Sequence, residues 1–127
     1  MQSLFNLYGG SEKISLWVLA FYEKVRDSHI LAPYFRDTDF PRLLDHQTKF
    51  VSSVMGGPFS FDDISIAHAH KNLGINREAF DHLLKLFRDT LIEFNVAPDD
   101  IRRIMAELKS REHLVIFEKR PPGQGPE

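Results

Sequence analysis

The stretch SEKISLWVLAFYEKVRD, residues 11–27, decides the fold class of this sequence. Its apolar side chains recur every three or four positions, at Ile14, Val18, Phe21, Tyr22 and Val25. That spacing matches the 3.6-residue period of an α-helix with one buried face. The pair Gly9-Gly10 in front of the stretch predicts a tight corner. We therefore expect a helix over 11–27 that packs on a core along this stripe.

The rest of the chain repeats the helical pattern, and no segment shows a sustained alternation of period two. A short turn over 4–7 is expected before the first helix, and a bend over 32–35 after it. A third helix follows a cap at Thr38 or Asp39 and ends before Gly56. We expect a loop over 59–65 and a short helix over 66–72. Asn76 caps a long helix whose apolar stripe is expected to run as far as Phe94, and Pro98 starts the last one.

These segments predict an all-α domain over 1–118. The tail over 119–127 is rich in proline and glycine, so we expect it to be disordered. A chain of 127 residues suits one domain with one core, and 11 phenylalanines fit a core built around a large flat ligand as well as an ordinary helical core.

Charge and cysteine content exclude several classes of function. The net charge is −2 with both signs interspersed, so the basic stripe that binds nucleic acid is missing. The absence of cysteine removes disulfides and thiolate metal sites, and fits a reducing compartment. The apolar run over 16–21 is too short to span a membrane. We expect a cytoplasmic protein without a membrane or nucleic-acid partner.

The six histidines are the candidate metal ligands. His68 and His70 are two positions apart, which on a helix places them about 200° apart and makes a shared zinc site improbable. His70 stands near the end of the short helix expected over 66–72, and Gly74 and Ile75 follow it. Its imidazole can therefore project across a pocket with Ile75 as an apolar wall, or it is a helix-end histidine favoured by the helix dipole. Local context leaves both interpretations open.

Tyr22 and Gln47 are polar side chains on otherwise apolar stripes. Gln47 replaces an apolar residue between Leu43 and Val51, and His46 borders the same face. A buried glutamine costs roughly 1–3 kcal/mol if it is unpaired. The two side chains therefore either bond to each other or point at a polar ligand.

An ordered set of short strings makes the sequence resemble the truncated haemoglobins of group I, above all their cyanobacterial-type members. The strings are Tyr8-Gly9-Gly10, Phe21-Tyr22, Tyr34-Phe35, His46-Gln47, Gly56-Gly57-Pro58, His70 with Gly74-Ile75, and Phe80-Asp81. The resemblance covers about residues 3–115. Each string is weak alone, whereas the set at these spacings is specific.

The resemblance implies a two-over-two helical sandwich around haem b, iron protoporphyrin IX. It makes His70 the proximal iron ligand and Phe35 a side chain that packs on the haem. Tyr22 and Gln47 would line the distal side and donate hydrogen bonds to bound O₂. Further haem contacts would come from Leu43, which stands where many globins have a distal histidine, and from Phe50 and Ile75.

The resemblance leaves the roles of two other histidines open. In some relatives a histidine at the position of His46 ligates the iron when no gas is bound; otherwise His46 is a surface histidine near a propionate. His113 aligns with a histidine that in some cyanobacterial-type members bonds covalently to a haem vinyl group. The alternative is a partly exposed helix histidine.

The function implied is binding of O₂, NO and CO at ferrous haem, with dioxygenation of NO to nitrate as the expected reaction. An external reductase would be needed, because the chain has no flavin or nicotinamide motif. The alternative is an electron-transfer or redox- or gas-sensing protein held in a bis-histidine state. A haem-free helical interaction module ranks below both. We expect a monomer.

Overall fold

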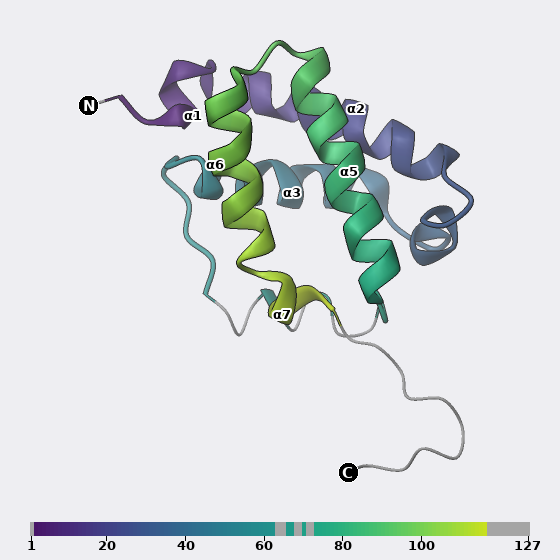
Figure 1. Ribbon diagram of the computed structural model, residues 1–127. Coiled ribbons are helices and arrows are strands. Elements are labelled where there is room, and N and C mark those ends of the chain that lie inside the picture. Colours follow the sequence, from purple (N-terminus) through teal and green to yellow (C-terminus); the bar gives the residue numbers. More distant parts are fainter. Residues whose placement is uncertain (1, 63–65, 68–69, 71–72, 117–127) are drawn as a thin grey trace.

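The computed structural model describes residues 2–62, 66–67, 70 and 73–116, and its regular elements over these residues are all helical (Figure 1). They are α1 (Leu4–Leu7), α2 (Gly10–Asp27), the 3₁₀ turn η1 (Ala32–Phe35), α3 (Phe40–Val54), α5 (Arg77–Glu93), α6 (Pro98–Lys109) and α7 (Glu112–Val115). The all-α prediction is confirmed. Most of the helix expected over 66–72 and the whole tail over 119–127 lie outside the described residues.

The predicted helix boundaries follow from capping chemistry. The Asp39 side chain accepts a hydrogen bond from the Arg42 N–H at the start of α3, and Asn76 accepts one from Ala79 at the start of α5. Gly9 and Gly10 have φ angles of 97° and 73°, which side chains with a Cβ rarely adopt. The predicted corner before α2 is therefore confirmed.

Three details differ from the prediction. The bend over 32–35 is a 3₁₀ turn, and the single-turn helix α7 follows α6. Phe94, expected in the buried stripe of the long helix, lies one residue beyond the end of α5 and is 38% exposed. Because Phe94 lies outside the helix, it does not continue the buried stripe. Its ring packs against the ring of Trp17 in α2, with the ring centroids 6.4 Å apart.

Two helix pairs form the body of the molecule. α2 packs on α3, α5 packs on α6, and α2 also contacts α5. Figure 1 shows the α5–α6 pair crossing in front of α2 and α3. Fully buried aliphatic side chains from both pairs meet in the core, among them Ile14, Val18, Val25, Leu91 and Ile104. This layering turns one face of each of α2, α3 and α5 toward a common pocket.

The N-terminal segment is fastened to α6 through Tyr8. The Tyr8 hydroxyl donates to the Asp100 carboxylate and accepts the N–H of Ala97, whose side chain cannot cap α6 itself. Within the described residues, no helix is long and apolar enough to cross a membrane.

Candidate functional site

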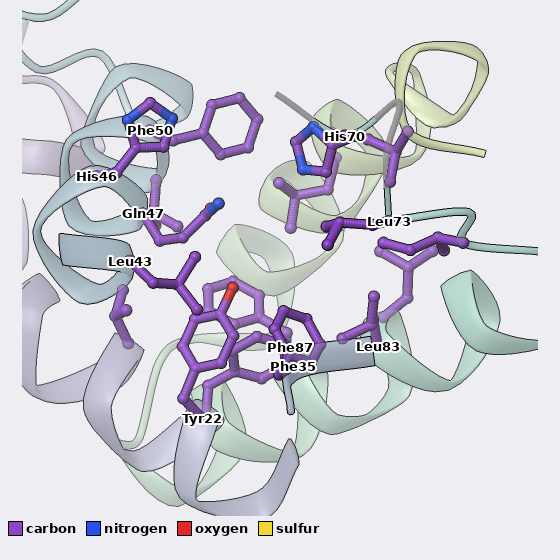
Figure 2. A pocket seen from close by; sticks show the side chains of 17 residues that line it. Tyr22, Phe35, Leu43, His46, Gln47, Phe50, His70, Leu73, Leu83 and Phe87 are labelled. Carbon is purple, nitrogen blue, oxygen red and sulfur yellow. The ribbon is translucent and has the colours of Figure 1, made fainter. Parts of the chain in front are cut away.

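One largely apolar pocket lies between the helix pairs (Figure 2). It encloses about 950 Å³ between side chains, part of it open to solvent. The lining residues are Val18, Phe21, Tyr22, Phe35, Leu43, His46, Gln47, Phe50, Val51, His70, Leu73, Ile75, Leu83, Leu84, Phe87, Leu108 and Val115.

His70 is the half-buried imidazole on one side of this pocket. Its Nδ1 lies 2.7 Å from the Ile66 carbonyl oxygen, and since a carbonyl only accepts, Nδ1 carries the proton and donates. Nε2 therefore keeps its lone pair for a ligand. Burial, followed by the charge of His46, lowers the pKa of His70, although its bond to Ile66 opposes the shift. A neutral imidazole with a fixed tautomer is suited to bind iron.

Tyr22 approaches the pocket from α2, and Figure 2 shows its hydroxyl pointing into the space. The ring is held edge-to-face by Phe21 and Phe35, with centroids 4.8 and 5.8 Å away. Burial raises the pKa of the phenol well above its usual range, so it remains a hydrogen-bond donor. No hydrogen bond joins Tyr22 to Gln47 or to any other side chain among the described residues, which removes the alternative of an internal Tyr–Gln pair.

One face of α3 supplies the wall opposite His70. Leu43 and Gln47 are four residues apart, as are His46 and Phe50, so each pair lies along one side of the helix, and all four line the pocket. Figure 2 shows His46 and Gln47 on the α3 side and His70 across the pocket from them. The helix thus presents one imidazole and one amide toward the imidazole of His70.

The other predicted site residues are split between the pocket and the surface. Phe35 and Ile75 are buried and line the pocket. His113 is exposed on α7 and is not a lining residue, whereas Val115 of the same turn lines the pocket. Positions two apart on a helix point about 200° apart, so this turn presents Val115 inward and His113 outward.

Sequence reasoning missed two parts of the site. Val115 lies in a helix of four residues, too short to show a period, so its inward side could not be identified. Phe61, in the segment after α3, contacts the rings of His46 and Phe50. A loop has no periodicity, and only its aromatic character marked this residue.

The donor set of the pocket fits a haem. Single imidazoles converge on it from two sides, and no group of three or more His, Cys, Asp or Glu side chains suited to a metal ion occurs in the described part of the chain. A bare ion held by protein alone needs about four ligands. A flat apolar group that brings its own equatorial ligands needs only an axial imidazole and apolar walls, which this pocket supplies.

Comparison with known proteins agrees with this fit. The family model of the bacterial-like globins matches residues 3–117. The group 1 truncated haemoglobin GlbN of a Synechocystis species is 32% identical over 110 residues, which are 84% of this chain and 89% of that protein. A group 1 truncated haemoglobin of Chlamydomonas moewusii is 31% identical over 95% of this chain and 72% of its own.

Solved structures show the same fold. A 2/2 haemoglobin of Synechococcus sp. PCC 7002, in the cyanomet state with covalently attached haem, superposes with a TM-score of 0.80 at 30% identity, covering 88% of this chain and 94% of that one. The truncated haemoglobin of Tetrahymena pyriformis gives a TM-score of 0.83 at 23% identity over 92% of this chain and all of its own. The expected two-over-two arrangement is therefore confirmed.

Proposed function

Because the chain belongs to the bacterial-like globins, and among them to the group 1 truncated haemoglobins, we propose that it uses haem b to bind O₂, NO and CO and to oxidise NO to nitrate. The family binds haem and diatomic gases. The observation that carries the proposal is His70: its Nδ1 bond to Ile66 leaves Nε2 free beside the apolar pocket. When bound, the haem would supply the ferrous iron and the electron that turn O₂ and NO into nitrate.

The apolar walls hold the group and keep water away from it. Phe35, Phe50 and Phe87 line the pocket from three different elements, with Ile75 and Leu84 between them. Removing this surface from water stabilises a flat apolar ligand by about 25 cal/mol for each Å² buried. His70 then needs only to fix the position and orientation of the haem.

Tyr22 and Gln47 supply polarity on the side opposite His70. The Tyr22 phenol stays protonated and has no hydrogen-bond partner among the described residues, and the Gln47 amide carries two further donors. Donors held in place beside a developing negative charge stabilise it without reorganising. They therefore favour O₂, which becomes polarised on binding, over CO.

Nitrate yield tests the reaction. We expect the O₂-loaded protein to give one nitrate for each NO consumed and to end in the ferric state, so that turnover requires an external reductase. A yield far below one nitrate per NO would contradict the dioxygenase function while leaving gas binding intact. The proposal is for a cytoplasmic monomer, and size-exclusion chromatography with light scattering tests the oligomeric state.

A second candidate function is electron transfer or redox and gas sensing in a bis-histidine state. His46 and His70 line the same pocket from opposite sides, and the charge of His46 contributes to the lowered pKa of His70. Two axial imidazoles would give a low-spin centre that a gas must displace. We propose that His46 is this second ligand at rest.

The ferrous spectrum without added gas tests the role of His46. Split α and β bands are expected for the wild type and their loss for His46→Leu. His29→Leu, an exposed histidine remote from the pocket lining, is the matched control. If His46→Leu keeps the split bands, His46 is not the ligand.

Covalent attachment of the haem at His113 is the remaining part of the proposal. The Synechococcus relative carries covalent haem. In this chain α7 must turn to bring His113 inward, because Val115 lines the pocket in its place. Acid–acetone extraction should then leave colour in the wild-type protein pellet and none with His113→Ala. A colourless wild-type pellet would show that the haem is not covalently bound.

A further inference from the structure

Phe61 lies against the imidazole of His46 at the rim of the pocket. The two ring centroids are 5.3 Å apart and their planes meet at 82°. Phe61 also packs against Phe50, at 5.8 Å and 78°. His46 and Phe50 are four residues apart on α3, so one ring from the following segment covers two side chains on the same helix face.

Backbone hydrogen bonds lie on both sides of Phe61, and those before it tie the segment to the end of α3. Gly57 N–H donates to the Ser52 carbonyl at 2.7 Å, and Phe59 N–H donates to Gly57 at 2.9 Å. A Cβ on Gly57 would meet the Ser52 oxygen at 2.9 Å, so the turn packs tightly on the end of α3. On the far side, Ile66 N–H donates to the Asp62 carbonyl at 3.1 Å.

The contact competes with any movement of His46 into the pocket. His46 is exposed and lines the pocket at its edge, whereas Phe61 is not a lining residue. An imidazole that reaches toward the middle of the pocket, opposite His70, must therefore leave the Phe61 ring. Edge-to-face aromatic pairs favour the arrangement in which the rings stay together.

We propose that Phe61 is a positioning residue that holds the His46 imidazole at the rim and so sets how much of the protein is open to gas. This inference rests on the His46 ligation proposed above. Loss of the Phe61 ring should increase the ratio of His46-ligated to open protein by roughly twofold to tenfold, the range expected for one aromatic pair. The apparent gas affinity should fall by about the same factor, because it scales with the open fraction.

The test compares five variants of the haem-loaded protein, one of which is His46→Leu alone. Phe61→Leu removes the ring and Phe61→Tyr retains it. Phe59→Leu is the matched control, because Phe59 lies in the same half-buried segment and forms no ring contact with His46 in the described part of the chain. Phe61→Leu combined with His46→Leu shows whether the effect passes through His46. The measured quantities are the low-spin ferrous fraction and the CO association rate after flash photolysis.

We expect Phe61→Leu to raise the low-spin fraction and slow CO binding, Phe61→Tyr and Phe59→Leu to resemble the wild type, and the His46→Leu background to abolish the effect. Unchanged behaviour in Phe61→Leu, where His46→Leu alone changes both quantities, would overturn the inference. An effect of equal size in the His46→Leu background would also overturn it. If His46→Leu changes neither quantity, the ligation itself is wrong, and the role of Phe61 falls with it.

Proton NMR of the haem-free protein tests the contact independently of iron. The His46 ring protons should show nuclear Overhauser effects to Phe61, and ring-current shifts that disappear in Phe61→Leu and persist in Phe61→Tyr. Absence of these signals in a folded wild-type protein would contradict the contact on which the inference stands.

Discussion

A buried phenol without a partner is the most informative single residue of this molecule. Tyr22 is 7% exposed, and no hydrogen bond satisfies its hydroxyl among the described residues. The hydroxyl itself faces the pocket, as Figure 2 shows, so it is placed to donate a hydrogen bond to a ligand there. Three aromatic rings, those of Phe21, Phe35 and Phe40, fix its direction.

Replacing Tyr22 with Phe should therefore change gas binding more than folding. A hydrogen bond to a charged acceptor contributes about 1.5–3 kcal/mol, so O₂ should dissociate roughly ten to a hundred times faster from Tyr22→Phe. CO, which gains little from the bond, serves as the internal control and should change by less than threefold. Stopped-flow O₂ displacement measures the first rate, and an unchanged O₂ rate would contradict the role of Tyr22.

For single residues, the sequence predicted which side chains on periodic helices belong to the site, and it missed those in segments without a period. Tyr22 and Gln47 were identifiable because each interrupts an apolar stripe, and the structure places both in the pocket. Their roles toward a gas remain predictions. Phe61 could not be assigned, because nothing in a loop sequence indicates which helix side chain its ring will contact.

Among the elements, α7 is a single turn joined to α5 by an ion pair. Its four residues are too few to be stable alone, and Arg77 at the start of α5 pairs with Glu112 at the start of α7 at 2.6 Å. Leu114 is buried, and Val115 closes part of the pocket. The ion pair thus links α7, which forms part of the pocket wall, to the start of α5.

Acid should release α7 before the rest of the fold. The hydrogen bond from Arg77 is the main reason that the pKa of Glu112 lies below its ordinary 4.5. A depressed pKa means that the carboxylate stabilises α7 at neutral pH and stops doing so as the pH falls through that lowered value. Glu112→Gln should mimic the acid state at neutral pH, with faster hydrogen exchange at the amides of Leu114 and Ile116, which bond within this turn.

Asp89→Asn is the control for this prediction, because it removes an exposed ion pair with Lys85 that is internal to α5. It should leave both amides protected. Equal exchange in Glu112→Gln and the wild type would show that packing of Leu114, rather than the ion pair, holds α7.

The long elements could be read from sequence and the short ones could not. The α2 stripe, the caps at Asp39 and Asn76 and the start of α6 all follow from period and capping chemistry. α7 and the 3₁₀ turn η1 are single turns of four residues that form because tertiary packing holds them.

For the whole molecule, the pocket between the two helix pairs presents an apolar surface that a bound ligand would remove from water. Its walls carry several large aromatic side chains, among them Phe35, Phe50 and Phe87. A ligand that binds only the folded state stabilises it by about 4 kcal/mol when its concentration is a thousand times its dissociation constant.

Haemin should therefore raise the Tm of the haem-free protein by on the order of 10 °C in differential scanning calorimetry. His29→Ala should leave this increase intact, since His29 is exposed and does not line the pocket. A Tm that does not respond to haemin would contradict haem binding altogether.

The most direct test of the central claim, that His70 is the axial ligand which fixes the haem, is the ferrous spectrum of His70→Gly with and without added imidazole. We expect the wild-type bands to be lost in His70→Gly and restored by imidazole, which fills the space the side chain leaves. His82→Gly, a half-buried histidine of α5 that is not a lining residue, should keep the wild-type spectrum without imidazole. A wild-type spectrum from His70→Gly without imidazole would contradict the account.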